Sequence, residues 1–267
     1  MFTTIDGRRY FTVSFGAGPR TLLAHSGWIG SWEDWLGILE VLSQSWRTVA
    51  YDHRGAGDTR VPAADITRDA MVNDLFRVLD TFAIERCVLG GFSSGTLVTL
   101  LAALRQPERF SGLLLLNSSL RLPAPPALPP AAPVAAAPAT DAPLDFATRM
   151  RRTIEAMTPE TGDDIEAIRQ WAHHHILMSS NPATEPVVRA AFRSADLDLF
   201  SRVHELTMPT LLIHGGNDSF ADRASVEYLA AHIPRSKLVV FEDSGHLPGM
   251  TRPQEVAAAI NDFFGSV

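Results

Sequence analysis

The sequence predicts an α/β fold in which a mostly parallel eight-stranded sheet carries helices on both faces. Short apolar runs of strand length alternate along the chain with longer stretches of helical periodicity. This alternation is typical of parallel sheets whose strands are connected by helices. The chain has 267 residues, enough for one large domain or for a domain with an insertion. The third observation is a glycine-bounded turn at residues 91–95, between an apolar strand and an apolar helix.

The N-terminal half supplies most of the expected strands. Two β-rich runs flank the pair Asp6-Gly7, which favours a hairpin of residues 2–5 and 9–15. Short apolar runs then predict buried strands at residues 21–25, 48–51, 87–90 and 113–116. Apolar residues recur at helical spacing between these strands, and they predict helices that begin near residue 31, at residue 67 and at residue 96.

The C-terminal half resumes the same alternation. Residues 210–214 and 237–241 are short apolar runs and are expected to be the last strands. Helices are expected at residues 221–232 and 253–264, where apolar positions again follow the helical period. Because strands and helices alternate on both sides of the middle segment, the two halves are expected to share one sheet.

The middle of the chain interrupts this pattern. Residues 121–143 contain 8 prolines and 9 alanines, and proline at that density cannot continue a helix or a central strand. We therefore expect a Pro/Ala-rich linker at 121–143, followed by a helical cap insertion at 144–200. Residues 1–120 and 201–267 would form the core domain.

Composition restricts the partners. The net charge is −7 and the sequence has no Lys/Arg cluster, so nucleic acid is not an expected partner. No apolar stretch is long enough to span a bilayer, and the N-terminus lacks the apolar region of a secretory signal. A cytoplasmic protein that binds a small-molecule substrate is expected, without a membrane partner and with a homodimer left open. No cofactor is expected. The single cysteine, Cys87, is expected to fill core space.

The turn at residues 91–95 has the sequence Gly-Phe-Ser-Ser-Gly. A G-x-S-x-G pattern between a strand and a helix predicts a strained turn that exposes the hydroxyl of its middle residue, Ser93. The amide of Ser94 would then lie at a helix N-terminus, where partial positive charge favours an anion. An ordinary Gly/Ser turn would show the same residues without this role.

Two further polar residues follow later strands. Asp218 comes after the strand at 210–214, and His246 comes after the strand at 237–241. Ligands of open parallel sheets bind at the C-terminal ends of the strands, so both can approach Ser93. An imidazole can act as the base that a serine hydroxyl needs, and a carboxylate can orient that imidazole. His214 competes with His246 for this role, and Asp222 and Asp243 compete with Asp218.

The run His173-His174-His175 suggests a metal site at first sight. Successive residues of a helix diverge by about 100°, so three in a row cannot converge on one ion. We expect these histidines to line a pocket or to be solvated, and we expect no metal site.

These motifs together resemble the α/β-hydrolase fold family, in its common form with a helical cap. The resemblance covers nearly the whole chain. The segments that carry it are His25-Ser26-Gly27-Trp28, Asp52-His53-Arg54-Gly55-Ala56-Gly57, Gly91-Phe92-Ser93-Ser94-Gly95, His214-Gly215-Gly216-Asn217-Asp218 and Gly245-His246.

The resemblance implies that Ser93 is a nucleophile, His246 its base and Asp218 the acid. It also implies an oxyanion hole formed by the amides of Ser94 and Trp28. The family usually has His-Gly where this chain has His25-Ser26-Gly27, so the amide of Gly27 could serve instead of that of Trp28.

The same resemblance implies a serine hydrolase. The favoured substrate is a carboxylic ester or lactone of a small to medium apolar compound. A C–C bond hydrolase is the second candidate and a cofactor-free perhydrolase the third, and a small-molecule receptor is the candidate from another class. An apolar substrate pocket is expected from Gly27, Phe92, Met150, Trp171, Met178 and Leu247.

Overall fold

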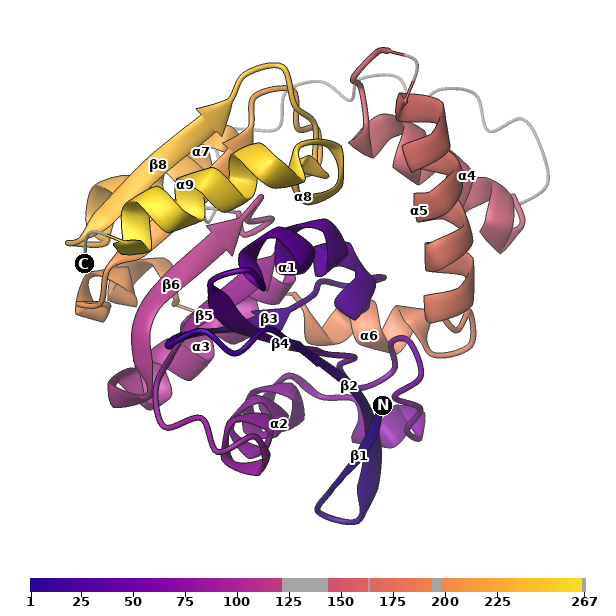
Figure 1. Ribbon diagram of the computed structural model, residues 1–267. Helices are drawn as coiled ribbons and strands as arrows, with labels where there is room; N and C mark the ends of the chain where they lie inside the picture. The colour runs from indigo at the N-terminus through magenta and orange to yellow at the C-terminus, as the bar shows by residue number, and fades with distance from the viewer. Residues whose placement is uncertain (122–143, 163, 194–197, 266–267) are drawn as a thin grey trace, which may run out of the picture.

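The computed structural model describes residues 1–121, 144–162, 164–193 and 198–265 (Figure 1). In these residues eight strands form one twisted sheet in the order β1-β2-β4-β3-β5-β6-β7-β8. The strands are β1 (Phe2–Ile5), β2 (Arg8–Phe15), β3 (Arg20–His25), β4 (Trp46–Tyr51), β5 (Cys87–Phe92), β6 (Phe110–Leu116), β7 (Thr210–Gly215) and β8 (Ser236–Phe241).

The sheet is mixed at one edge and parallel elsewhere. β1 and β2 form the predicted antiparallel hairpin, and Asp6 and Gly7 at its turn both have positive φ, as a two-residue hairpin turn requires. β2 also pairs antiparallel with β4, whereas every pair from β4 to β8 is parallel. The C-terminal ends of β3 to β8 therefore lie along one edge, and the residues that follow these strands can meet there.

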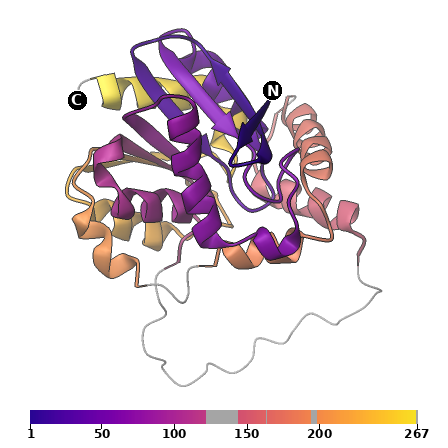
Figure 2. The same cartoon turned by 90° about the horizontal axis from the view of Figure 1, so that it is seen from below.

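Helices cover both faces of the sheet, as the alternating pattern predicts. α1 (Leu36–Leu42) and α9 (Pro253–Gly265) pack together on one face, and α2 (Arg68–Thr81), α3 (Gly95–Arg105) and α7 (Arg223–His232) pack on the other. Figures 1 and 2 show these two layers from two directions. Each face has its own apolar core, and burial of this surface is the main driving force for the arrangement.

Three further helices follow β6 in the chain: two stand beside the sheet on the right of Figure 1, and the third runs back toward the sheet, where its Val188 and Ala191 join the apolar core covered by α2 and α3. These cap helices are α4 (Phe146–Met157), α5 (Ile165–Ser179) and α6 (Glu185–Ala191). Apolar residues of α4 and α5 join the core cluster that contains Leu247. The predicted linker at 121–143 lies outside the described residues except for Arg121, and the predicted domain boundaries remain predictions.

The local structure differs from the sequence-based expectation at two places. A 3-10 helix, Trp32–Trp35, precedes α1, where a single helix from about residue 31 was expected. Ser31 caps this short helix by accepting a hydrogen bond from the amide of Glu33. A one-turn helix, α8 (Pro248–Thr251), follows His246 before α9, and proline at its first position explains why it begins there.

None of the helices in the described part of the chain combines the length and the apolar character needed to cross a bilayer.

Candidate active site

The turn between β5 and α3 holds Ser93 in a left-handed backbone conformation, with φ 52°. The glycines on either side are required by close packing. A Cβ on Gly91 would lie 2.3 Å from Thr99 Oγ1 and 2.9 Å from the Cα of Thr96, and a Cβ on Gly95 would lie 2.5 Å from the carbonyl oxygen of Ser26. Only glycine lets α3 approach the sheet this closely.

Ser93, His246 and Asp218 form a continuous chain of hydrogen bonds. The Ser93 hydroxyl lies 2.8 Å from His246 Nε2, and His246 Nδ1 lies 2.7 Å from Asp218 Oδ2. The side chains of His246 and Asp218 are 1% and 0% exposed. The loop that carries His246 is anchored by the His246 amide, which donates to the carbonyl of Met157 at the end of α4.

Asp218 is held by more than the imidazole. Its Oδ1 accepts hydrogen bonds from the amides of Phe220 and Ala221, and its Oδ2 also accepts one from Asn117 Nδ2 at 2.7 Å. Burial raises the pKa of the Asp218 carboxyl, but the hydrogen bonds from His246, Asn117 and Ala221 outweigh burial and hold that pKa below its ordinary value. Asp218 is therefore ionised at neutral pH.

Sequence reasoning missed Asn117. This residue follows β6, is fully buried and has positive φ, so it sits at a strand end like the other three polar residues. Its position directly after an apolar strand is the signal that could have identified it.

The competing residues lie elsewhere. Asp222 caps α7 by accepting from the amide of Ser225, Asp243 is exposed, and His214 is buried at the end of β7.

His53 orients the peptide between Gly27 and Trp28. His53 Nε2 lies 2.8 Å from the carbonyl oxygen of Gly27, and because C=O and N–H point in opposite directions across a trans peptide, the Trp28 amide faces the turn. There it donates to Ser94 Oγ at 2.8 Å. Burial lowers the pKa of His53, although its contacts with the carbonyl oxygens of Gly27 and Arg54 oppose this shift. The neutral ring carries one N–H and donates to only one of these two carbonyls. The role of His53 was not predicted, since its loop was interpreted as turn geometry alone.

Polar contacts also fix the Trp28 side chain to the cap helices. Its Nε1 donates to Glu185 Oε1 at 2.7 Å, and Arg189 stacks over the indole at 4.1 Å while it pairs with Glu185. Both partners belong to α6, so the loop after β3 and the cap hold one another in place.

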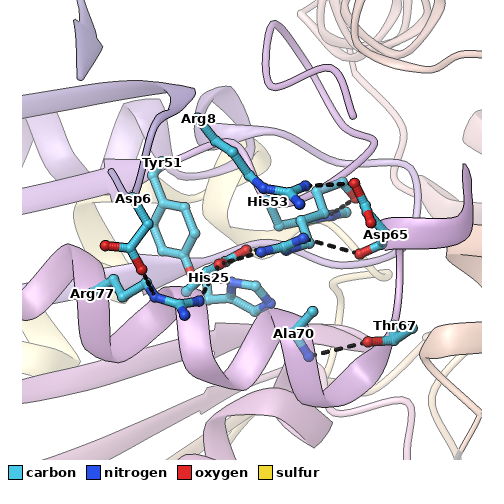
Figure 3. Close-up of polar contacts among 11 residues, drawn as sticks. Asp6, Arg8, His25, Tyr51, His53, Asp65, Thr67, Ala70 and Arg77 are labelled. Atoms are coloured by element: carbon cyan, nitrogen blue, oxygen red, sulfur yellow. Dashed lines mark hydrogen bonds and ion pairs between the residues drawn. The ribbon is translucent and has the colours of Figure 1, made fainter. Parts of the chain in front are cut away.

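A charged network involves the loop that carries His53, and Figure 3 shows one part of it, the pair of Arg8 with Asp65. Arg54 and Asp74 form a buried bidentate ion pair, and Arg54 also donates to the carbonyl of Asp65, whose carboxylate pairs with Arg8. The two parallel hydrogen bonds of such a bidentate pair fix the orientation of both side chains, in addition to pairing their charges. The network therefore fixes residues 52–54 and, through them, the Gly27 carbonyl.

A small cavity adjoins the Ser93 hydroxyl. Its volume is ≈ 30 Å³, room for about two water molecules. Its described lining is mostly apolar and consists of Gly27, Trp28, Ile29, Gly30, Asp34, Phe92, Ser93, Met157, Ala172, Ile176, His246, Leu247 and Met250. A larger hollow of ≈ 460 Å³ lies at the opposite, N-terminal ends of the strands and contains none of the three hydrogen-bonded residues.

The structure brings three of the six predicted pocket residues to this cavity, namely Gly27, Phe92 and Leu247. It does not bring the other three there. Met150 is 1% exposed and packs inside the apolar core beneath the cap helices. Trp171 and Met178 are 38% and 64% exposed on the outer side of α5. Helical periodicity placed these residues on helices but could not tell which side of each helix faces the cavity.

His175 is the buried member of the histidine run. Its Nδ1 lies 2.5 Å from Glu33 Oε2, and its Nε2 lies 3.2 Å from Asp34 Oδ1. Burial by itself lowers the pKa of His175, but the hydrogen bonds to Asp34 and Glu33 outweigh burial and raise that pKa to about 9. His175 is thus an imidazolium at neutral pH. Within the described ranges, no group of His, Cys, Asp and Glu side chains is arranged to hold a metal ion.

The comparisons with known proteins agree with this architecture. The family model described as alpha/beta hydrolase fold matches residues 20–253, and the chain belongs to that family of hydrolytic enzymes.

Its relatives have several activities. The chain is 31% identical over 261 residues to the pimeloyl-acyl-carrier protein methyl ester esterase of Aeromonas salmonicida, covering 94% of this chain and 97% of the relative. It is 29% identical over 266 residues to the 2-hydroxymuconate semialdehyde hydrolase of Pseudomonas sp. strain CF600, covering 93% and 87%. An esterase structure from Exiguobacterium antarcticum superposes with a TM-score of 0.79 at 21% identity, covering 99% and 98%.

Replacement of Gly91 by alanine tests the packing of the turn. The new Cβ would clash with the backbone of α3, so Gly91→Ala should lower the free energy of unfolding by about 1–3 kcal/mol. Urea unfolding followed by circular dichroism measures this. Gly265→Ala is the matched control, because a Cβ there meets nothing within 4 Å. Equal stability of the two variants would contradict the packing argument.

The His175 contacts predict a pH-dependent contribution to stability. The folded pKa of about 9 lies above the ordinary value, so the contribution is complete below about pH 6.5 and is lost as pH rises through 9. The free energy of unfolding of the wild type should exceed that of His175→Asn by up to about 3 kcal/mol at pH 6. This difference should shrink by pH 10. A difference that is constant from pH 6 to pH 10 would contradict the raised pKa of His175.

Proposed function

We propose that this chain is a serine hydrolase that cleaves a carboxylic ester or lactone of a small to medium apolar substrate through an acyl-enzyme on Ser93. The observation that carries the proposal is the buried hydrogen-bond chain from Ser93 through His246 to Asp218. In this arrangement a serine hydroxyl has a base within reach, and the base has a carboxylate that fixes its tautomer.

The reaction follows from these contacts. Ser93 Oγ attacks the carbonyl carbon while its proton passes to His246 Nε2, and Asp218 stabilises the imidazolium that results. The tetrahedral intermediate collapses, and the alkoxide leaves with the proton from His246. A water molecule then repeats the sequence on the acyl-enzyme and releases the acid.

The amides of Ser94 and Trp28 would hold the oxyanion. The Ser94 amide lies at the N-terminus of α3, and the Trp28 amide faces the same turn. The Trp28 amide donates to the Ser94 hydroxyl, so the oxyanion would take the place of that hydroxyl. The Ser94 side chain would have to rotate away first, and both amides could then stabilise the charge that develops in the transition state.

The substrate class rests on the cavity and on the relatives. The lining is mostly apolar and the free volume is small, which favours a short apolar group beside the scissile bond. The relative that is 31% identical is a methyl ester esterase, in agreement with an ester bond.

A C–C bond hydrolase is the second candidate, favoured by the relative that acts on 2-hydroxymuconate semialdehyde. A muconate carries a carboxylate. The described lining of the cavity contains no arginine or lysine to pair with it. The lack of a cationic side chain there favours an ester over a carboxylate-bearing substrate. Neither perhydrolysis nor a receptor function has an observation of this kind in its favour, and both rank below ester cleavage.

Replacement of Ser93 by alanine removes the nucleophile. Ser93→Ala should lower kcat for p-nitrophenyl acetate by about 10³–10⁶-fold with folding intact, and it should abolish covalent labelling by a fluorophosphonate. Ser111→Ala, at an exposed position of β6, is the control and should keep full activity. Turnover by Ser93→Ala within tenfold of the wild type would remove Ser93 from the mechanism.

The size of the cavity predicts a chain-length preference. Short p-nitrophenyl esters such as the acetate and butyrate should show kcat/KM at least about tenfold above that of the decanoate, since each added methylene must find space. A series of esters, lactones and a ring-cleavage dienoate, measured under the same conditions, separates the candidates. Faster turnover of the dienoate would favour the C–C bond hydrolase. Tight binding of these compounds without turnover or labelling would favour the receptor.

A further inference from the structure

The loop that carries His246 is attached to the cap as well as to its own strand. This loop follows β8 and contains three buried residues in a row, Ser244, Gly245 and His246. Two consecutive amides of the loop donate to the segment between α4 and α5. The Gly245 amide donates to Glu160 Oε1 at 2.8 Å, and the His246 amide donates to the carbonyl oxygen of Met157 at 2.7 Å.

Glu160 Oε1 accepts three hydrogen bonds. Besides the Gly245 amide, it accepts from Ser244 Oγ at 2.9 Å and from Thr251 Oγ1 at 3.3 Å. These donors lie on both sides of His246 in the chain, so one oxygen connects the two ends of its loop. Ser244 is fully buried, and without Glu160 its hydroxyl and the Gly245 amide would be left unpaired, which is unfavourable for buried donors.

The backbone that carries Glu160 is itself held in place. Arg169, on α5, donates from Nε to Thr158 Oγ1 at 3.0 Å. Its Nη2 donates to the carbonyl oxygens of both Thr158 and Glu160. A single guanidinium thus makes three contacts with residues 158–160. The Glu160 side chain therefore extends from a fixed support, which is what a side chain needs in order to position another group.

Close packing accompanies these hydrogen bonds. A Cβ on Gly245 would lie 2.2 Å from Pro159 Cδ and 2.3 Å from the carbonyl oxygen of Met157, so only glycine lets the loop approach the cap this closely. On the core side, Asn117 Nδ2 donates to the carbonyl oxygen of Gly245 at 3.2 Å. Gly245 is therefore held through its amide by the cap and through its carbonyl by the core.

This attachment differs from the other polar contacts of the cap. Trp28 and His175 also join the cap to the core, but their contacts are not with the residues next to His246. A base must stay within hydrogen-bond reach of the proton that it moves. Since His246 Nε2 lies 2.8 Å from Ser93 Oγ, a shift of its loop would alter this distance directly, and a displacement of about 1 Å can lower a rate by about 10²-fold.

We propose that Glu160 is a positioning residue for His246. Through Oε1 it holds the backbone that precedes His246, and the imidazole thereby stays between Ser93 and Asp218. The inference rests on the proposed hydrolase and adds a residue of the cap segment to its machinery. Glu160 is absent from the described lining of the cavity beside Ser93, so it acts through the loop and not on the substrate.

The test separates the reach of the Glu160 side chain from its charge. Glu160→Gln keeps Oε1 and places its amide nitrogen at Oε2, which has no hydrogen-bond partner within the described residues. It should keep kcat for p-nitrophenyl acetate within about threefold of the wild type. Glu160→Asp keeps the carboxyl group but shortens the side chain by one methylene, and Glu160→Ala removes the acceptor. Both should lower kcat by about 10–100-fold, with KM changed by less than about threefold because the cavity lining is intact.

The control is Glu155→Ala, the same substitution at an exposed position of α4, which should keep full activity. Two further readouts follow His246 directly. The rate of fluorophosphonate labelling of Ser93 should fall in parallel with kcat. The far-downfield proton resonance of the hydrogen bond between His246 Nδ1 and Asp218 should persist in Glu160→Gln and weaken in Glu160→Ala.

Two results would overturn the positioning role. One is a folded Glu160→Ala whose kcat stays within about threefold of the wild type, even if its free energy of unfolding is lower, since Glu160 would then only attach the cap. The other is a loss of kcat in Glu160→Gln as large as that in Glu160→Asp. If Glu160→Ala does not fold, this comparison of Gln with Asp decides the question.

The two proposals fail in different ways. Absence of ester hydrolysis by the wild type, together with no fluorophosphonate labelling of Ser93, contradicts the hydrolase. Hydrolysis by the wild type that Glu160→Ala and Glu160→Asp leave unchanged contradicts only the role of Glu160.

Discussion

The left-handed backbone of Ser93 is the constraint on which the site depends. A non-glycine residue rarely adopts positive φ, and it does so only where its surroundings hold it. Here β5 and α3 meet so closely around the turn that Gly91 contacts the backbone of α3 and Gly95 contacts the carbonyls that end β3. The packing of two buried elements thus holds the strained residue, and the hydroxyl stands clear of both.

The other polar groups depend on the same sheet edge. Asn117, Asp218 and His246 follow β6, β7 and β8, and hydrogen bonds link all three. Because parallel strands bring their C-terminal ends together, residues far apart in the chain meet without long loops. On the other side of the turn, the buried Arg54–Asp74 pair fixes the loop that carries His53, and His53 contacts the Gly27 carbonyl.

The cap is joined to the site by polar contacts as well as by apolar packing. Trp28 bonds to Glu185 of α6, and His175 of α5 bonds to Glu33 and Asp34. These contacts bury charge, and buried charges require defined geometry to be tolerated. The position of the cap helices is therefore coupled to the Trp28 amide beside the Ser93 turn and to Asp34, the one acidic residue in the described cavity lining.

Much of the fold could be predicted because its signals are local. Apolar runs and helical periods identified the strands and most helices, and the flanking glycines made the Ser93 turn recognisable. The pocket was harder to predict, since Met150, Trp171 and Met178 sit on helices whose facing side depends on neighbours far along the chain. His53, Asn117 and Asp34 were not singled out, because a polar residue in a loop is usually solvated and its sequence does not tell when it is buried.

The sequence by itself determined which segments form strands and helices, where the chain turns sharply, and which residues follow the strands, because these properties depend on neighbours within a few positions. Only the tertiary structure decided that His246 lies beside Ser93, 153 residues away, that His53 turns the Gly27–Trp28 peptide toward it, and that Asp34 at the same cavity is buried and paired with His175. Those facts are set by burial and by the distances between elements that the folded sheet brings together.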